Sequence, residues 1–154
     1  MPAKENYVKI LFKFYSDVLD EQTAETMWAE VVDESKGIYK LNSIPFYAPN
    51  IACGDTVIAT YDTDEQMLTF EAIIEFSGNS TVQVALMDKS IPTNDIREVF
   101  HDLGCATEKF KEGYFVIDVP VVLNFTPIES KLKELSGSGV LDYAIPCLSD
   151  QHRV

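Results

Sequence analysis

The chain has 154 residues, of which 46% are apolar, and its 25 acidic and 12 basic residues give a formal net charge of −13 at pH 7. This length is sufficient to bury a core in one domain or in two very small ones. The negative field repels nucleic acids and anionic membrane surfaces and speeds encounter with basic partners, so neither of the first two is expected as a ligand.

The cysteines and the N-terminal segment indicate a soluble cytoplasmic protein. Cys53, Cys105 and Cys147 are odd in number and lack CxxC spacing, which argues against a disulfide framework and for a reducing compartment. The segment "MPAKENYVKILFKFYSDVL" interrupts its apolar residues with Lys9 and Lys13 and has no small-residue cleavage site, unlike a signal peptide. No apolar run approaches the roughly 18 residues of a membrane span.

The first half of the chain shows the alternation of short β-strands. In "YVKILFKFY" (7–15) the apolar residues fall on one face and Lys9 and Lys13 on the other. After the acidic connection "SDVLDEQTAE", strands are expected in "TMWAEVVD", "GIYKLN", "GDTVIATYD" and "MLTFEAIIEF". Five short strands at regular spacing favour a small β-barrel or a rolled antiparallel sheet.

The turn "SGNS" (77–80) is the expected boundary, so we predict an all-β subdomain over 1–80 and an α+β subdomain over 81–154. A strand in "TVQVALMD" precedes a helix in "IPTNDIREVFHDLG". This helix has Ile96, Val99, Phe100 and Leu103 at helical spacing and is expected to stop at Gly104.

A second helix is expected in "TPIESKLKELSGSG", after a hairpin formed by "CATEKF" and "GYFVIDVP". Thr126 is interpreted as its capping residue, Pro127 as its first helical position and Glu129 as the partner in a capping box. With the last strand in "VLDYAIPCL", the order from residue 81 is strand, helix, strand, strand, helix, strand. This order is the ferredoxin-like βαββαβ pattern, so the fold class is α+β. The tail "SDQHRV" is expected to fray.

The inventory of chemical groups predicts no catalytic residue, no metal and no cofactor, and therefore no enzyme. His101 is expected to face solvent and His152 lies in the tail, and neither has a second histidine at metal-ligand spacing. Cys105 and Cys147 are interpreted as small apolar fillers, whereas Cys53 lies in a loop. The segment "YDTDEQ" lacks the glycine and the glutamate of a calcium loop.

The apolar loop "LNSIPFYAPN" (41–50) has two interpretations. It either closes the end of the barrel against the second half or shows an aromatic anchor to a partner. The second interpretation draws on charge, because residues 1–80 contain 14 acidic and 5 basic residues, a net −9. The predicted partner-binding residues are the anchors Trp28, Phe46 and Tyr47 and an acidic rim of Asp17, Asp20, Glu21, Asp62, Asp64 and Glu65.

Three segments resemble a bacterial family known as a domain of unknown function, number 4265. They are "NSIPFY" (42–47), "GDTV" (54–57) and "SGNSTVQV" (77–84), and "MWAEVV" and "VIDVP…PIESKL" also fit. The resemblance runs from about residue 7 to 145 and implies no established activity. Members usually carry a histidine where this chain has Asn79, so any chemistry that depends on that histidine is absent here.

Three functions follow from these observations. The favoured one is an immunity protein that neutralises a basic toxin, such as a nuclease, by direct binding, with the acidic field steering association. The alternative is an enzyme or small-molecule-binding domain with a cleft between the halves near Cys53, Asp55 and Asn79. For that segment we also consider a structural role, in which Asp55 accepts backbone N–H bonds. The third is a module that pairs through a sheet edge. The oligomeric state stays open.

Overall fold

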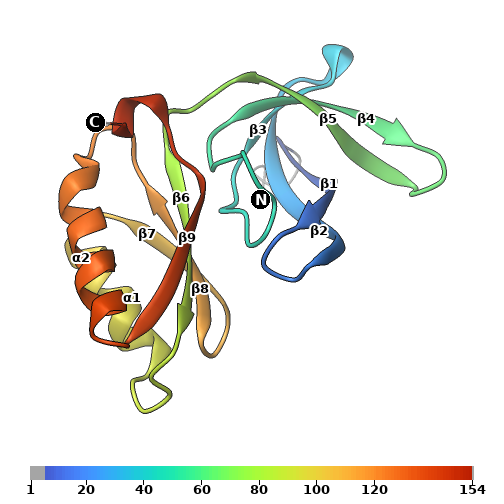
Figure 1. Cartoon of the computed structure of the whole chain (residues 1–154). Helices are drawn as coiled ribbons and strands as arrows, with labels where there is room; N and C mark the ends of the chain where they lie inside the picture. The colour runs from blue at the N-terminus through green and yellow to red at the C-terminus, as the bar shows by residue number, and fades with distance from the viewer. Residues whose placement is uncertain (1–5, 154) are drawn as a thin grey trace. The chain divides into compact units, whose positions relative to one another are not determined.

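The protein is described by a computed structural model that covers residues 6–153. Two compact units make up the chain, unit 1 (Met1–Ser77) and unit 2 (Gly78–Val154), and the division falls in the "SGNS" turn. Each unit contains one mostly antiparallel sheet, and the α-helices of the described residues lie in unit 2 (Figure 1). The fold class is therefore α+β, as predicted.

Unit 1 is a curved five-stranded sheet. Its strands are β1 (Tyr7–Ser16), β2 (Glu21–Asp33), β3 (Ile38–Leu41), β4 (Thr56–Asp62) and β5 (Met67–Glu75), with a short 3-10 helix, η2 (Glu34–Lys36), between β2 and β3. Consecutive strands pair antiparallel, and β5 also pairs with β1 in parallel, at Ile10–Leu68 and Leu11–Thr69. The five strands predicted from alternation are all present.

Strand β2 begins earlier than the sequence suggested. Residues 21–25 were expected in an acidic connection, but they pair with residues 12–16 of β1. The extended hairpin continues the ladder because the backbone groups of both strands find partners there, whatever the polarity of the side chains. Inside the sheet, Ile10, Met27 and Val57 are buried, and the rings of Phe12 and Phe70 stack with centroids 4.8 Å apart.

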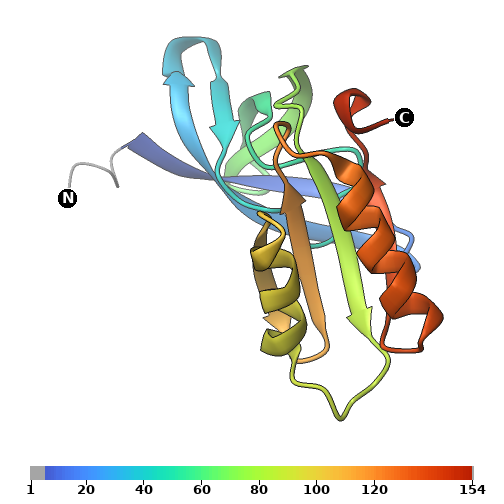
Figure 2. The ribbon, with the colours of Figure 1, turned by 90° about the vertical axis from the view of Figure 1, so that its left-hand side faces the viewer.

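Unit 2 contains the predicted order of strand, helix, strand, strand, helix, strand. The elements are β6 (Ser80–Leu86), α1 (Thr93–Asp102), β7 (Ala106–Lys111), β8 (Tyr114–Val119), α2 (Phe125–Gly137) and β9 (Leu141–Cys147), followed by the 3-10 helix η3 (Asp150–His152). The antiparallel sheet has the order β7-β8-β6-β9. Both α-helices cover the same face of this sheet (Figure 2).

The helix ends confirm one capping prediction and correct another. After α1, Gly104 adopts a φ of +99° and its N–H donates to the carbonyl of His101 over 2.9 Å, which is the predicted stop. At α2 the prediction was wrong, because the N-cap is Asn124 and not Thr126. The side chain of Asn124 accepts a hydrogen bond from the backbone N–H of Thr126 over 3.0 Å, so the helix begins at Phe125.

The C-terminal tail is ordered as far as the structure describes it, contrary to the expectation of fraying. His152 is 4% exposed, its ring stacks on Phe125 at 5.5 Å, and its Nε2 donates to the carbonyl of Pro120 over 3.0 Å. Its Nδ1 lies 2.6 Å from the hydroxyl of Ser80, which also accepts the N–H of Ser149 over 2.8 Å. Burial of the ring and these bonds together hold the tail on unit 2.

We predict that Phe100→Ala destabilises unit 2 by about 3–5 kcal/mol, the usual cost of removing a buried phenylalanine. Phe100 is fully buried and its ring centroid lies 6.4 Å from that of Phe115. Urea unfolding followed by circular dichroism at 222 nm measures this loss through the helical signal. Phe110→Ala is the control because Phe110 is 50% exposed. Equal midpoints for the two variants would contradict the prediction.

Candidate functional site

The apolar loop between β3 and β4 is held on unit 1 by a carboxylate of β2. The carboxylate of Glu25 accepts hydrogen bonds from three successive backbone N–H groups, those of Phe46 (3.0 Å), Tyr47 (2.9 Å) and Ala48 (2.6 Å). In the β1–β2 register Glu25 stands opposite the buried Phe12, so its side chain lies on the core side of the hairpin. A loop rich in apolar residues is thereby tied down through its backbone.

The start of the loop is tied to β2 at a second point. The backbone N–H of Trp28 donates to the hydroxyl of Ser43 over 3.0 Å, and its carbonyl accepts the N–H of Asn42 over 2.8 Å. Farther along the loop, Ala48 and Ile51 belong to the core of unit 1. The loop therefore covers the end of the core of unit 1. This agrees, for unit 1, with the interpretation in which the loop closes the end of the sheet.

The two aromatic side chains of the loop are half-buried. Burial raises the pKa of Tyr47, and the nearby charge of Glu25 raises it further. Phe46 and Tyr47 thus take part in a fixed loop, and neither is a freely exposed anchor. Whether they also touch a partner stays a prediction.

Asp55 is a structural carboxylate. It is 1% exposed, and its two oxygens accept the backbone N–H groups of Ala52 (2.9 Å) and Ser77 (2.8 Å). Burial raises the pKa of Asp55, whereas these hydrogen bonds act in the opposite direction. Both oxygens of Asp55 accept backbone hydrogen bonds, which agrees with the structural role considered for this residue. The side chain of Asp55 therefore gives no support to the alternative function of binding a small molecule.

Trp28 lies apart from the loop aromatics. It is 49% exposed, and the ammonium of Lys9 lies 5.1 Å from its ring centroid. Because Glu25 and Trp28 are three residues apart on one strand, their side chains point to opposite faces of β2. Trp28 therefore stands on the outer face of the hairpin, beside a lysine, and does not share the face to which Glu25 holds the loop.

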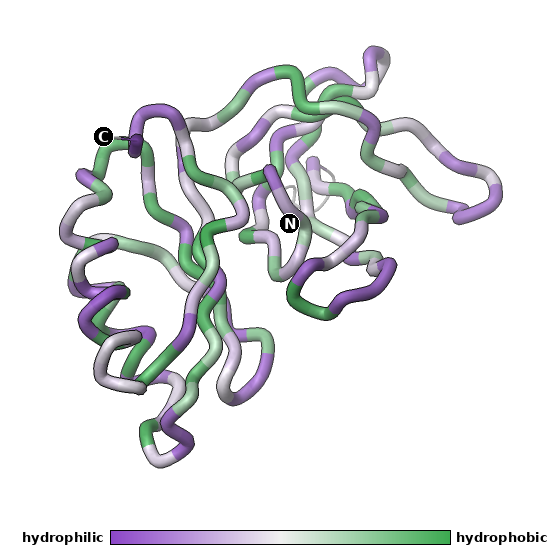
Figure 3. The backbone as a smooth tube through the Cα atoms, in the orientation of Figure 1, coloured by the Kyte–Doolittle hydropathy of each residue, from purple (hydrophilic) through white to green (hydrophobic). Residues whose placement is uncertain are grey.

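The predicted acidic rim consists of two separate turns. One contains Asp17 and Asp20 and leads into Glu21 of β2; the other runs from Asp62 through Asp64 and Glu65. Figure 1 shows these turns as two separate loops, and Figure 3 shows the hydrophilic end of the β4–β5 hairpin.

Several carboxylates of the rim already have partners. Asp20 accepts a hydrogen bond from the hydroxyl of Tyr15, and this bond is the main reason that the pKa of Tyr15 is raised. Glu65 forms an ion pair with Lys13 at 3.3 Å. The carboxylate of Asp62 accepts the N–H groups of Asp64 (2.8 Å) and Glu65 (3.3 Å) and so stabilises its own turn.

The β1–β2 turn also exposes apolar side chains that the sequence analysis did not single out. Tyr15 is 47% exposed, Val18 52% and Leu19 41%, and they alternate with the carboxylates of this turn. We call residues 15–21 the acidic–apolar turn. The sequence carries a signal for this feature in "SDVLDEQ", where two aliphatic residues stand within an otherwise polar connection. A turn that only faces solvent does not need aliphatic side chains.

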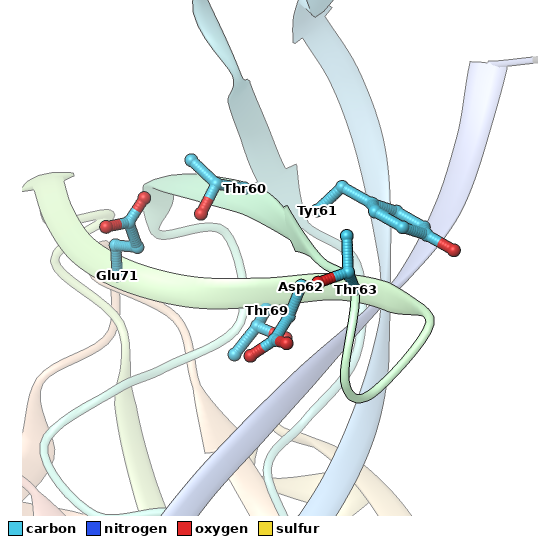
Figure 4. Close-up of a pocket in the computed structure, with 6 residues that line it drawn as sticks. All are labelled: Thr60, Tyr61, Asp62, Thr63, Thr69 and Glu71. Atoms are coloured by element: carbon cyan, nitrogen blue, oxygen red, sulfur yellow. The ribbon is translucent and has the colours of Figure 1, made fainter.

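A depression lies on the β4–β5 hairpin (Figure 4). It has a volume of about 360 Å³, is open to solvent, and is lined by Thr60, Tyr61, Asp62, Thr63, Thr69 and Glu71. Of these residues only Asp62 was among the predicted binding residues. A sequence signal for the depression is the broken alternation in "MLTFEAIIEF". Phe70 and Ile73 both pack on the core although they are three residues apart, which indicates an irregularity in the strand.

Cys105 and His152, the buried cysteine and the buried histidine among the described residues, take part in packing. Burial, together with the charge of Asp118, raises the pKa of Cys105 to about 11, so its thiol stays protonated at neutral pH. Ser80 and His152 hold the tail, as described above. Within residues 6–153, no three His, Cys, Asp or Glu side chains gather in a way that would hold a metal ion, and no helix is both long and apolar enough to cross a membrane.

We predict that Glu25→Ala releases the loop, because three backbone donors lose a charged acceptor. Hydrogen bonds to charged groups contribute about 1.5–3 kcal/mol each, so we expect unit 1 to lose about 2 kcal/mol or more. Amide hydrogen exchange at Phe46, Tyr47 and Ala48, measured by NMR, should accelerate. Glu30→Ala, an exposed change on the same strand, is the control. Unchanged exchange at these amides would refute the assigned anchor.

We predict a distinct pH dependence for Asp55→Asn. The raised folded-state pKa means that the contribution of Asp55 to stability is fully present below its unfolded pKa of 3.8 and is lost as pH rises through the folded-state pKa. The asparagine side chain does not titrate, and it has one acceptor oxygen where Asp55 has two. The variant should therefore be less stable than the native chain by about 1–3 kcal/mol at low pH.

The stability difference between the native chain and Asp55→Asn should therefore shrink as pH rises from about 3 to about 6. Urea unfolding followed by the fluorescence of the single tryptophan, Trp28, reports on unit 1. Asp64→Asn, in an exposed turn, should show no such trend. A difference that stays constant or widens with pH would contradict the prediction.

Comparison with other proteins places the chain in a family. A structure titled "Novel crystal structure of a hypothetical protein from Neisseria gonorrhoeae" matches with a TM-score of 0.79 and 23% identity, over 92% of this chain and 95% of that one. At this identity the likeness shows a shared fold. No curated protein matches the chain in sequence. The family model described as "Domain of unknown function (DUF4265)" matches residues 25–143, so the chain belongs to this family, as the resemblance of its motifs predicted.

Proposed function

We propose that the protein is a cytoplasmic immunity protein that binds a basic toxin domain, such as a nuclease, and blocks it by covering its surface. The observation that supports this proposal best is the acidic–apolar turn, residues 15–21. There, three apolar side chains that are 41–52% exposed alternate with Asp17, Asp20 and Glu21. Exposed apolar side chains among charges of one sign suit a partner that carries an apolar pocket within a basic surface.

The outer face of the β1–β2 hairpin extends this proposed interface. In the register, Tyr15 pairs with Gln22 and Lys9 with Trp28, so Tyr15 and Trp28 project from the same face. Of the three predicted anchors we therefore assign Trp28 to the interface and treat Phe46 and Tyr47 as part of the fixed loop. Tryptophan and tyrosine are the residues that most often dominate binding energy in protein interfaces.

The charge of unit 1 supports the choice of a basic partner. Its 14 acidic and 5 basic residues give 5 − 14 = −9, against 7 − 11 = −4 in the rest of the chain. A field of this sign attracts a basic protein and raises its association rate at low salt. The apolar contacts would then slow dissociation.

We also propose finer descriptions of the two units. Unit 1 is a small β-barrel, which the pairing of β5 with β1 supports. Unit 2 is ferredoxin-like, which its element order, its sheet order of β7-β8-β6-β9 and the placement of both helices on one face support. Neither description implies a function, because such folds carry many.

The proposal predicts capture of a basic partner that depends on the acidic–apolar turn. The tagged chain is incubated with lysate of its native cell at about 50 mM and about 500 mM salt, which spans the range over which exposed charges become strongly screened. We expect one basic protein, retained at low salt and weakened at high salt. Its toxicity on expression should be abolished when this chain is co-expressed.

A matched pair of variants tests the assigned surface. Asp17→Lys with Glu21→Lys should lower the association rate of the captured protein at low salt by about tenfold or more. Asp102→Lys with Glu108→Lys changes the net charge equally on exposed residues of unit 2 and should have much less effect. Absence of a partner at both salt concentrations, or a partner that is not toxic, would overturn the proposed function. Equal effects of the two pairs would overturn the assigned surface.

A further inference from the structure

The depression on the β4–β5 hairpin is shaped by an irregularity in the strand pairing. Ala59 pairs with Phe70 and Ile58 with Ala72, so Glu71 has no partner residue on β4. Such a β-bulge bends its strand and re-aims side chains. In Figure 4, Glu71 and Tyr61 stand at opposite ends of the depression, with the threonine side chains and Asp62 between them.

The lining is composed of hydrogen-bonding side chains alone. The six lining residues carry three threonine hydroxyls, one phenol and two carboxylates, and Thr60 and Thr69 are directly paired across the hairpin. The lining contains no positively charged residue. A ligand there meets many acceptors and two negative charges.

The carboxylates of the depression retain capacity to accept hydrogen bonds. Both backbone donors to Asp62 bind its Oδ1. Within residues 6–153, no hydrogen bond or ion pair engages the carboxylate of Glu71. The nearby lysine on β1, Lys13, is paired with Glu65 instead. The negative charge of Glu71 is thus available to a cation from outside the chain.

The shape of the depression favours a side chain of a macromolecule over a free small molecule. Its volume of about 360 Å³ lies at the low end of ligand pockets, and it is open to solvent. An open site buries too little of a free ligand to repay the entropy lost on binding. A side chain delivered by a protein surface is covered by that surface and held by its other contacts.

We infer that this depression binds the guanidinium group of an arginine on the partner protein. The planar group presents five N–H donors, which suit the acceptors that the depression offers on both strands. This inference rests on the proposed function, since it assumes a basic protein partner. The ion pair between Lys13 and Glu65 joins the β4–β5 turn to β1, so the depression lies next to the proposed interface.

The test uses the purified chain and a defined probe, the peptide acetyl-Gly-Arg-Gly-amide, titrated into the ¹⁵N-labelled protein. We expect amide shifts at Thr60, Tyr61, Thr69 and Glu71 that saturate in the millimolar range. Glu71→Gln should weaken binding about two- to fivefold, the range for an exposed charge pair. Glu75→Gln, an exposed change on the same strand outside the depression, should leave binding unchanged.

Matched peptides separate guanidinium recognition from simple charge attraction. Peptides with citrulline or lysine in place of arginine should bind more weakly than the arginine peptide. Equal binding of the citrulline or the lysine peptide, equal effects of Glu71→Gln and Glu75→Gln, or no shift at these amides would each overturn the inference.

Failure of the arginine site and failure of the proposed immunity function give different experimental results. Arginine-peptide binding without any captured partner would refute the immunity function and support the site. A captured partner whose affinity does not change with Glu71→Gln would refute the site alone.

Discussion

The architecture of unit 1 depends on carboxylates placed inside it to accept backbone hydrogen bonds. Between β3 and β4 the chain runs through an irregular loop, where several N–H groups find their acceptors outside the strand ladders. Glu25 accepts three of them, and Asp55 accepts one within the loop and one from Ser77. A buried backbone donor without a partner is costly, so these two side chains allow apolar loop residues to pack on the core.

This arrangement divides the acidic residues of unit 1 into two groups with different roles. Glu25 and Asp55 act inward on the backbone, and their loss should loosen the loop. Asp17, Glu21 and Asp64 are exposed in or beside turns, where they contribute charge to the surface. Such exposed carboxylates add little to stability, which leaves them available for recognition of a partner. The same residue type thus supports the fold in one place and the proposed binding in another.

Repeated sequence patterns predicted the strands and helices correctly, whereas the roles of single polar residues were not predicted. Alternation identified all five strands of unit 1, and helical spacing with a terminal glycine identified α1 and its end at Gly104. Asn124 was overlooked as a cap because Thr126, two residues later, also fits a capping pattern. The tail was expected to fray, since nothing in "SDQHRV" indicates that His152 meets Ser80 and Pro120, which are far away in sequence.

By itself, the sequence determined the α+β class, the order of the elements, the acidic charge and the family, because periodicity and short motifs are local properties of the chain. Only the tertiary structure decided the surroundings of each candidate residue. It placed Trp28 and the aromatic loop on different faces of β2, separated the two acidic turns, and exposed Glu71 through a bulge. These outcomes depend on strand register and on contacts between distant residues, which no local pattern encodes.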